Sequence, residues 1–349
     1  MDLKDRIRAG IDVSEATVLE IGPLYRPFFR KDECRVTYVD HADTETLREK
    51  YRVGHGFDVN DIVAIDAVWG ERSLSECLGS ERRVRHVIAS HVIEHVPDLV
   101  TWLDELVSVL EPGGEIRLVV PDKRFTFDYL RRDTGLPEVL DAYLRRARRP
   151  LSYCILDHVM NVRQVDTGEA WRGPLDPERL VPYHSVEMAI AIARDALDTD
   201  NYHDVHCWVF TPSSFARLMQ QLVEHGLSRL VCRHFEDTPH NSLEFIVFVT
   251  PSDDREAALE SWRAMERGVQ AVLPPPEQAP EQAPEQATEQ ASEQATVPET
   301  AGAMPAPEPE PRPEPALVVE ASVPGPASPP APPGMVRRVQ SAIARRIGY

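Results

Sequence analysis

Two acidic residues and a glycine have the types and spacing of a site for a nucleotide-like ligand. Glu20 and Gly22 follow the apolar pair 18–19, and Asp40 closes a second apolar run at 35–39, eighteen residues after the glycine. Two short β-branched runs, separated by room for a helical crossover, predict neighbouring strands of a parallel sheet. Ligands bind outside the carboxyl ends of such strands, so both acids would face one crevice. Gly22 would let the backbone approach the ligand, and Asp40 would bind a ribose diol. The alternative is that a strand simply ends in Gly-Pro and that the acid downstream is unrelated to it.

The elements that would position these residues follow from hydrophobic patterning. Residues 85–90 predict a third core strand, and 100–110 predict a helix with an apolar stripe. The run Pro112-Gly113-Gly114 then breaks the chain, and 115–120 predicts another strand. Strand, helix, turn and strand form a second β-α-β unit, which follows the one predicted from the strands around Glu20 and Asp40. The predicted fold class is therefore a doubly wound α/β domain.

Four stretches, in this order, resemble the class I S-adenosylmethionine-dependent methyltransferases of the type 11-like group. They are Val18-Leu19-Glu20-Ile21-Gly22-Pro23, Tyr38-Val39-Asp40-His41-Ala42, Ser90-His91-Val92-Ile93-Glu94-His95-Val96 and Leu110-Glu111-Pro112-Gly113-Gly114. Two further runs, 120–128 and 204–212, resemble a bacterial branch associated with cell-surface polysaccharide and glycosyltransferase genes. The similarity covers roughly residues 15 to 250. It implies S-adenosylmethionine as cofactor and a seven-stranded, mostly parallel, Rossmann-like sheet with an antiparallel last strand.

The resemblance also implies which residues contact the cofactor. The expected contacts are Glu20, Gly22, Pro23, Tyr25, Asp40, His41, Asp58, Ser90 and His91. Asp58 is expected to end the third strand and to lie near the adenine, and an exposed loop acid is the alternative. Glu94 and His95 are expected to give local hydrogen-bonding structure to their loop.

One departure from the family concerns the first motif. The family often has several glycines there, whereas Gly22 is followed by Pro23-Leu24-Tyr25-Arg26-Pro27. Without later glycines the backbone cannot make its closest approach, so Tyr25 and Arg26 would supply side-chain contacts instead. The absence of a phosphate-cradling glycine-rich turn also argues against NAD and FAD.

The second half of the domain predicts an insertion and a closing pair of strands. Residues 215–224 predict a helix, and 228–235 and 242–250 predict strands whose short connection requires antiparallel pairing. The irregular stretch 123–210 would then be an insertion between the fifth strand and the last helix. At the ligand end of the sheet it would cover the crevice and shape the acceptor site.

The insertion contains most of the candidates for proton transfer. Methyl transfer from a sulfonium is an in-line displacement that needs alignment, but a sugar hydroxyl also needs a base. The predicted catalytic residues are His158 next to Asp157, or His206 next to Asp204, with His91 and Asp122 reaching in from the strand ends. The alternative is that several of these histidines are surface or packing residues. His203 and His206 have HxxH spacing, but no third ligand is identifiable, and no metal is predicted.

Composition limits the class of substrate. The net charge is −19; residues 273–334 contribute −9 and residues 335–349 contribute +4, which leaves −14 on residues 1–272. A region this acidic would repel a phosphate backbone, so nucleic acid is not an expected substrate. The five cysteines show no metal spacing and predict free thiols in a reducing compartment. No targeting segment or membrane span is predicted, and we expect the cytoplasm, or the inner face of the membrane, as the location.

The C-terminal third differs from the rest of the chain. Residues 251–272 predict an amphipathic helix docked on its own domain rather than a dimerising coiled coil. Residues 273–334 contain eighteen prolines and a repeat of Glu-Gln-Ala-Pro type, and this composition predicts a disordered linker. Residues 335–349 predict a basic amphipathic helix that would bind a protein partner, an anionic membrane surface, or the acidic catalytic domain itself.

Three functions remain in competition at this point. The first is O-methylation of a sugar or glycan in surface-polysaccharide biosynthesis. The second is methylation of a small molecule, such as a lipid or a secondary metabolite. The third is a methyltransferase-like scaffold for glycosyltransferases that binds cofactor or glycan without turnover. The sequence does not identify the acceptor, the methylated position or the subunit number.

Overall fold

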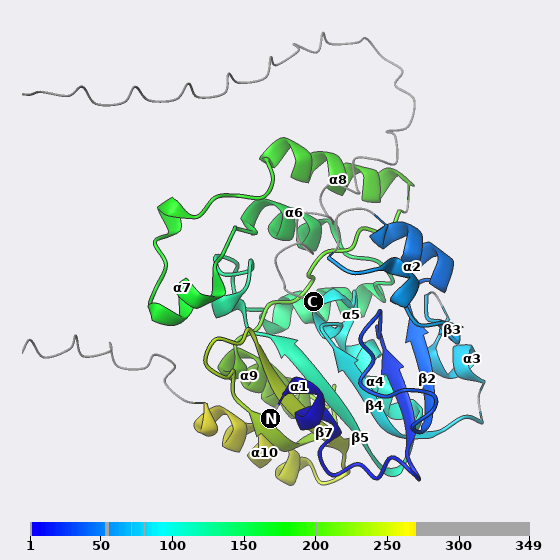
Figure 1. Ribbon diagram of the computed structural model, residues 1–349. Coiled ribbons are helices and arrows are strands. Elements are labelled where there is room, and N and C mark those ends of the chain that lie inside the picture. The colour runs from blue at the N-terminus through cyan, green and yellow to red at the C-terminus, as the bar shows by residue number, and fades with distance from the viewer. Residues whose placement is uncertain (1, 53–55, 71, 80, 200, 270–349) are drawn as a thin grey trace, which may run out of the picture. The chain divides into compact units, whose positions relative to one another are not determined.

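The computed structural model describes residues 2–52, 56–70, 72–79, 81–199 and 201–269 (Figure 1). The predicted linker 273–334 and the predicted helix 335–349 lie outside the described residues, as do the last residues of the predicted segment 251–272. No helix in the described part of the chain is long and apolar enough to cross a membrane.

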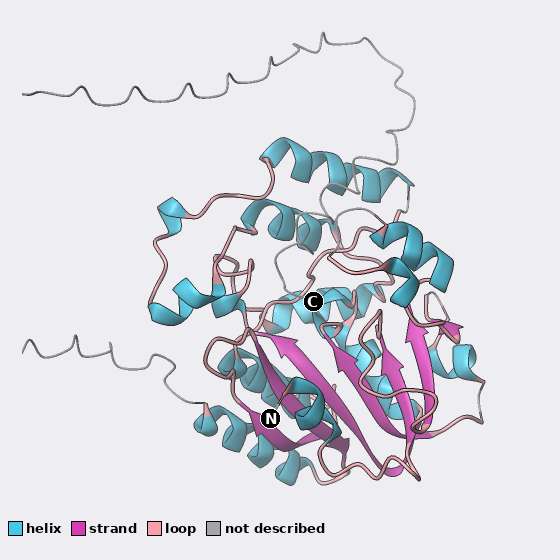
Figure 2. Cartoon of the chain, in the orientation of Figure 1, coloured by secondary structure: helices cyan, strands magenta, loops and turns pink. Residues whose placement is uncertain are grey.

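A seven-stranded sheet forms the centre of the domain, in the order β3-β2-β1-β4-β5-β7-β6 (Figure 2). The strands are β1 Thr17–Ile21, β2 Arg35–Asp40, β3 Ala67–Val68, β4 Val84–Ser90, β5 Leu110–Pro121, β6 Leu230–Glu236 and β7 Glu244–Pro251. The first five are parallel, and β7 is antiparallel to both of its neighbours. The predicted fold class, with its antiparallel pairing at the last strands, is confirmed.

Alternating side chains bury both faces of this sheet. Val18 and Ile88 face a core that includes Ile7 of α1 (Leu3–Arg8). Their neighbours Leu19 and Ala89 face the larger core, which contains side chains of α4, α9 and α10. These helices are α4 Leu99–Ser108, α9 Pro212–Glu224 and α10 Arg255–Gly268; α2 Thr44–Tyr51 and α3 Leu74–Leu78 complete the first half. Burial on both faces explains why the strand sequences are continuously apolar.

Two local predictions are wrong. The run 112–114 does not break the chain before a strand, because it lies inside β5, where the pairing with β4 shifts register and Gly113 has φ +74°. Asp58 does not end a strand: it is exposed and caps the short turn 59–61, while β3 begins nine residues later at Ala67. The Asp58 carboxylate accepts from the Asn60 backbone N–H at 2.9 Å, so it stabilises a local turn.

The predicted docking of the trailing helix is confirmed. In α10, Ala258, Trp262 and Met265 are buried, and the helix packs on α9 and β6. The indole Nε1 of Trp262 donates to the carbonyl of Leu230 at 2.8 Å.

Residues 122–211, between β5 and α9, form the segment that we call the insertion. It contains α5 Leu136–Arg145, α6 Ser152–Asn161, α7 Thr167–Arg172 and α8 Val186–Thr199. In Figure 1, α6 and α8 lie beyond the arrowheads of the parallel strands, which is the end of the sheet where ligands bind.

Candidate active site

A cavity of about 1000 Å³ opens at the carboxyl ends of the parallel strands, at the upper end of the size range of ligand sites. Side chains from the strand tips and from the insertion line it together. From the strand tips come Glu20, Gly22, Pro23, Tyr25, Asp40, His41, Ser90 and His91, and from the insertion Phe127, His158, Tyr202, Asp204 and His206. Of the nine predicted cofactor contacts, Asp58 alone does not line the cavity; its neighbour Phe57 does.

Gly22 closes β1 in a conformation that favours glycine. Its φ is +66°, and a Cβ at this position would lie 3.1 Å from Cγ2 of Val92 in the loop after β4. A side chain here would therefore fill the narrow space between the tips of β1 and β4. This narrow space beside the Gly22 backbone, which we call the Gly22 cradle, suits an elongated methyl donor without phosphate groups.

The Glu20 carboxylate holds the loop that follows Gly22. It is 2% exposed and accepts hydrogen bonds from the backbone N–H groups of Phe28, at 2.7 Å, and Phe29, at 3.1 Å. Burial raises the pKa of Glu20 to about 7, although these two N–H groups favour the charged form. Both oxygens therefore already have partners in the protein, and a contact with the amino-acid part of the donor stays a prediction.

Asp40 lies at the tip of β2, on the cavity wall. Its Oδ1 accepts from the His41 backbone N–H at 2.7 Å and lies 2.6 Å from Nδ1 of the same histidine. The His41 ring in turn lies against Tyr202 of the insertion, with 5.6 Å between ring centroids. This position is compatible with a contact to the ribose of the donor, and that contact stays a prediction.

His91, at the tip of β4, has a strained backbone with φ +53°. Its Nδ1 lies 3.6 Å from Glu94 and its Nε2 lies 3.9 Å from Glu244. Burial, with a further contribution from His206 and His95, lowers the pKa of His91 to about 3. The ring is therefore neutral and borders the strand-tip end of the cavity.

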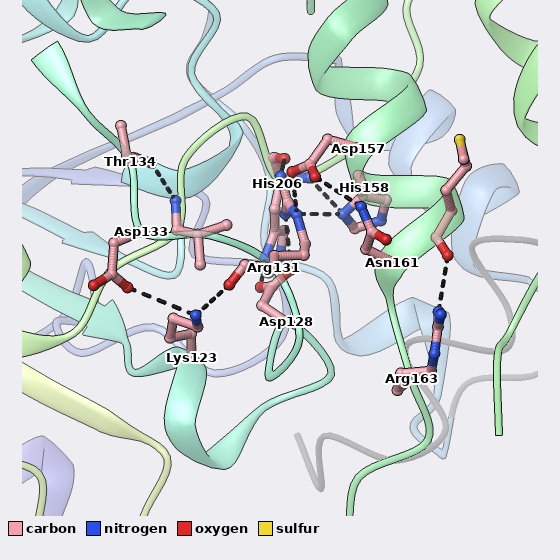
Figure 3. A network of polar contacts seen from close by, with 12 residues as sticks. Lys123, Asp128, Arg131, Asp133, Thr134, Asp157, His158, Asn161, Arg163 and His206 are labelled. Carbon is pink, nitrogen blue, oxygen red and sulfur yellow. Dashed lines mark hydrogen bonds and ion pairs between the residues drawn. The ribbon is translucent and has the colours of Figure 1, made fainter. Parts of the chain in front are cut away.

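His206 has a buried carboxylate partner that the sequence did not indicate (Figure 3). Its Nδ1 lies 2.5 Å from Oδ2 of Asp128, and Oδ1 of Asp128 accepts from Arg131 at 2.8 Å. Although burial opposes ionisation, His206 and Arg131 hold the pKa of Asp128 well below its usual range. In the neutral ring, an ionised Asp128 favours the tautomer in which Nδ1 carries the proton and Nε2 carries the lone pair.

The sequence neighbours of the two predicted bases have other partners. Asp157 accepts from Arg131 at 2.8 Å and from Asn161 at 2.8 Å, so it does not orient His158. Asp204 lies 2.7 Å from Nζ of Lys50 in α2 and 2.8 Å from Nδ1 of His95, so it does not orient His206.

His158 is buried and neutral. Burial and the nearby Arg131 guanidinium lower the pKa of His158 well below its usual value. Its Nδ1 accepts the backbone N–H of His206 at 3.2 Å, which leaves the proton on Nε2. This tautomer suits a hydrogen-bond donor and argues against the predicted role of His158 as a base.

Glu94 and His95 are both enclosed, and their side chains do not simply hydrogen-bond within their own loop, since His95 contacts Asp204 of the insertion. The Glu94 side chain is 1% exposed, and neither of its oxygens has a hydrogen-bond partner among the described residues. Burial raises the pKa of Glu94. His95 is also enclosed, yet Asp204 and Glu94 outweigh the effect of burial and raise the pKa of His95 to about 9.

Asp122 does not reach into the cavity as predicted. It has no exposed surface, and its carboxylate accepts from Arg124 at 2.6 Å and from the Thr238 hydroxyl at 2.8 Å. The two histidines of the HxxH spacing also have separate partners, because His203 pairs with Asp195 at 2.8 Å while His206 pairs with Asp128.

The residues present fit S-adenosylmethionine. Its amino-acid and ribose parts need polar partners near the strand tips, and Asp40 and the Gly22 cradle provide them. Aromatic rings line the same end, where Tyr25 stacks on Phe57 with 3.9 Å between centroids. Such a wall suits the flat adenine and the cationic sulfonium.

Comparisons with known proteins agree with this fold. The sequence model of a family described as a methyltransferase domain matches residues 2–222. No curated protein sequence matches the chain.

The chain is also similar to several solved structures, at low identity. A putative Zn-dependent alcohol dehydrogenase from Rhodobacter sphaeroides is 12% identical, with 71% of this chain and 88% of that chain covered and a TM-score of 0.41. A complex of DhpI with SAH is 16% identical, with 71% and 82% covered and a TM-score of 0.31. The glycopeptide N-methyltransferase MtfA in complex with S-adenosylmethionine is 13% identical, with 72% and 88% covered and a TM-score of 0.35. These scores are too low to support any argument about substrate.

Proposed function

We propose that this chain, which belongs to the family of methyltransferase domains, methylates an oxygen of a carbohydrate in surface-polysaccharide assembly. The methyl donor is S-adenosylmethionine. The methyl group of this donor is bound to a positively charged sulfur and is transferred by in-line displacement. The protein therefore has to hold donor and acceptor in line, exclude water and deal with the acceptor proton.

The His206–Asp128 pair is the observation that carries the proposal. A hydroxyl is a poor nucleophile while it holds its proton, whereas a neutral amine can attack without a base. Nε2 of His206 has a lone pair, Nδ1 is held by a buried carboxylate, and the ring borders the cavity. This arrangement is suited to accept the proton of a hydroxyl, and Asp128 would stabilise the imidazolium that results.

The walls of the insertion support a carbohydrate as the acceptor. Aromatic and basic side chains line this part of the cavity: Phe125, Phe127, Tyr183, Tyr202, Arg148 and Arg149. Rings can pack against the apolar faces of a sugar, and guanidinium groups can donate to its hydroxyls. The setting in polysaccharide assembly depends on the resemblance of the stretches 120–128 and 204–212.

Calorimetry and product analysis test the proposal in sequence. The full chain should bind S-adenosylmethionine and its demethylated product in calorimetry. It should then turn over with one of a panel of nucleotide sugars and isolated glycans, and mass spectrometry should locate the methyl group on oxygen. Methylation of nitrogen or carbon, or turnover on lipids or secondary metabolites alone, would contradict the proposal. Tight donor binding without product on any acceptor would favour the scaffold.

A further inference from the structure

Two groups of histidine and carboxylate ligands border the cavity, and His206 belongs to both. In each group, one ligand atom per residue lies within 4.8 Å of the others. One group is Glu94, His95 and His206; the other is Asp128, His158 and His206. Only the fold brings these residues together, because they come from the loop after β4 and from distant parts of the insertion.

The group with Asp128 and His158 does not suit a cation. Asp128 already accepts from Arg131 and from His206, and Arg131 also lies 3.4 Å from Nδ1 of His158. A metal ion there would face a buried guanidinium and would have to displace existing hydrogen bonds. Like charges in a low-dielectric interior make this arrangement costly.

The group with Glu94 has the opposite character. Glu94 is 1% exposed, and neither oxygen has a hydrogen-bond partner in the described part of the chain. Leaving a buried carboxylate without partners costs free energy, so such a group needs an explanation. The nearest ring nitrogens, Nδ1 of His91 and Nε2 of His95, lie 3.6 and 3.8 Å from Oε1 of Glu94, beyond hydrogen-bond distance.

A carboxylate lies beside Nδ1 of each histidine of this group, the nitrogen that a metal would not use, but only the contact of His206 with Asp128 has hydrogen-bond geometry. Asp204 lies 2.8 Å from Nδ1 of His95, and Asp128 lies 2.5 Å from Nδ1 of His206. Nε2 of His95 faces Oε1 of Glu94 at 3.8 Å, and Nε2 of His206 is left with its lone pair. Carboxylates that hold the distal nitrogen in this way are the usual outer partners of metal-bound histidines.

We propose that Glu94, His95 and His206 bind one divalent transition-metal cation of the Zn²⁺ type. Two imidazoles and one carboxylate form a recognised ligand set for Zn²⁺; binding would displace the Nε2 proton of His95, and the fourth position would open to the cavity. Bonds of about 2.0–2.2 Å would draw the three ligands slightly closer together than they stand here. Lys50 pairs with Oδ2 of Asp204 and Arg131 pairs with Oδ1 of Asp128, which are not the oxygens beside the two histidines.

The role of the cation rests on the proposed function. A bound cation would take the Nε2 lone pair of His206, to which proton transfer was assigned above. The acceptor oxygen would then bind at the open coordination position of the cation. There the cation would increase the acidity of the hydroxyl as a Lewis acid, and the hydroxyl proton would pass to water, because His206 would then be a ligand and no longer the base.

Metal binding by untagged full-length protein tests the site directly. After treatment with chelator, the protein is titrated with Zn²⁺ in a calorimeter, and bound metal is measured by elemental analysis. One equivalent is expected for the wild type, with at least a tenfold loss of affinity in Glu94→Gln and in His95→Gln. Matched controls are His203→Gln and His158→Gln, which remove other buried histidines and should keep one equivalent. Circular dichroism confirms that each variant is folded.

Substitution with Co²⁺ separates this site from binding by the five cysteines. The expected spectrum has visible bands of nitrogen and oxygen ligation without a thiolate charge-transfer band. Asp128→Asn keeps all three ligands and should weaken binding by about 10- to 100-fold through His206. Absence of binding by the wild type, a thiolate spectrum, or unchanged binding in both ligand variants would overturn the proposal. Donor affinity of the chelator-treated protein is measured in parallel, so failure of the metal site and failure of the methyltransferase proposal give different results.

Discussion

Two ends of the cavity are constructed differently: the strand-tip end, where we expect the donor and which we call the donor end, and the insertion end, where we propose the acceptor and which we call the acceptor end. At the donor end, the critical contacts join residues near in sequence: Glu20 to Phe28 and Phe29, and Asp40 to His41. At the acceptor end, Asp128 pairs with His206 across 78 residues, and Lys50 pairs with Asp204 across 154 residues. The two acids at the donor end thus have partners close in sequence, while the charged pairs at the acceptor end form only when the insertion is folded over the sheet. Substitutions should therefore separate donor binding from turnover.

The largest expected effect is on turnover, from His206→Asn. The amide can still donate to Asp128, but the basic nitrogen is lost. We expect kcat to fall by about 10²- to 10⁴-fold, with donor affinity unchanged. Steady-state kinetics and calorimetry on the same preparation measure both quantities, with His203→Asn as the matched control. A parallel loss of donor affinity would show that the two ends are not separable.

A large effect on stability is expected from Glu20, at the donor end. Because its pKa is about 7 in the folded protein against a usual 4.5, the folded state binds the proton more tightly. Its contribution to stability is therefore complete below about pH 4.5 and is lost as the pH rises to about 7. Glu20→Gln should remove on the order of 3 kcal/mol of this dependence. Urea unfolding of both proteins at intervals between pH 4 and 8 measures it, and parallel curves would contradict the assignment.

A smaller effect is expected from Asp40→Ala, and it should fall on the donor alone. Loss of charge-assisted hydrogen bonds to the ribose should weaken S-adenosylmethionine binding by about 10- to 100-fold. Calorimetry measures the affinity, and kcat at saturating donor should change much less. Unchanged affinity in a folded Asp40→Ala protein would remove the ribose assignment, and with it the donor end as described.

The smallest expected effect comes from outside both ends. Tyr153 lies on α6, within the insertion, and is 59% exposed. Tyr153→Ser should change the free energy of unfolding by less than about 0.5 kcal/mol and leave donor affinity unchanged. Thermal unfolding and calorimetry check this, and a clear loss of turnover would mean that the exposed face of α6 contributes to acceptor binding.

The accuracy of the sequence predictions follows the same division. All strands except β3, together with α4, α9 and the antiparallel closing pair, were predicted because periodicity is a local property that burial on the sheet enforces. The acids next to the candidate histidines in the sequence are not their partners, and for Asp157 the reason is physical. Asp157 and His158 are consecutive on a helix and point about 100° apart, so they cannot face each other. The stretch 120–128 was recognised as a motif, but nothing local showed that its last residue, Asp128, pairs with His206.

By itself, the sequence determined the α/β sheet, the strand tip where we expect the donor to bind, and the glycine that this tip requires. These follow from alternation, spacing and backbone conformation, which act over a few residues. The tertiary structure alone decided which carboxylate holds each histidine, which ring nitrogen is left available, and that Glu94 lies buried without a partner beside two of them. These properties arise from electrostatic contacts between distant segments, whose strength depends on burial that only the folded chain provides.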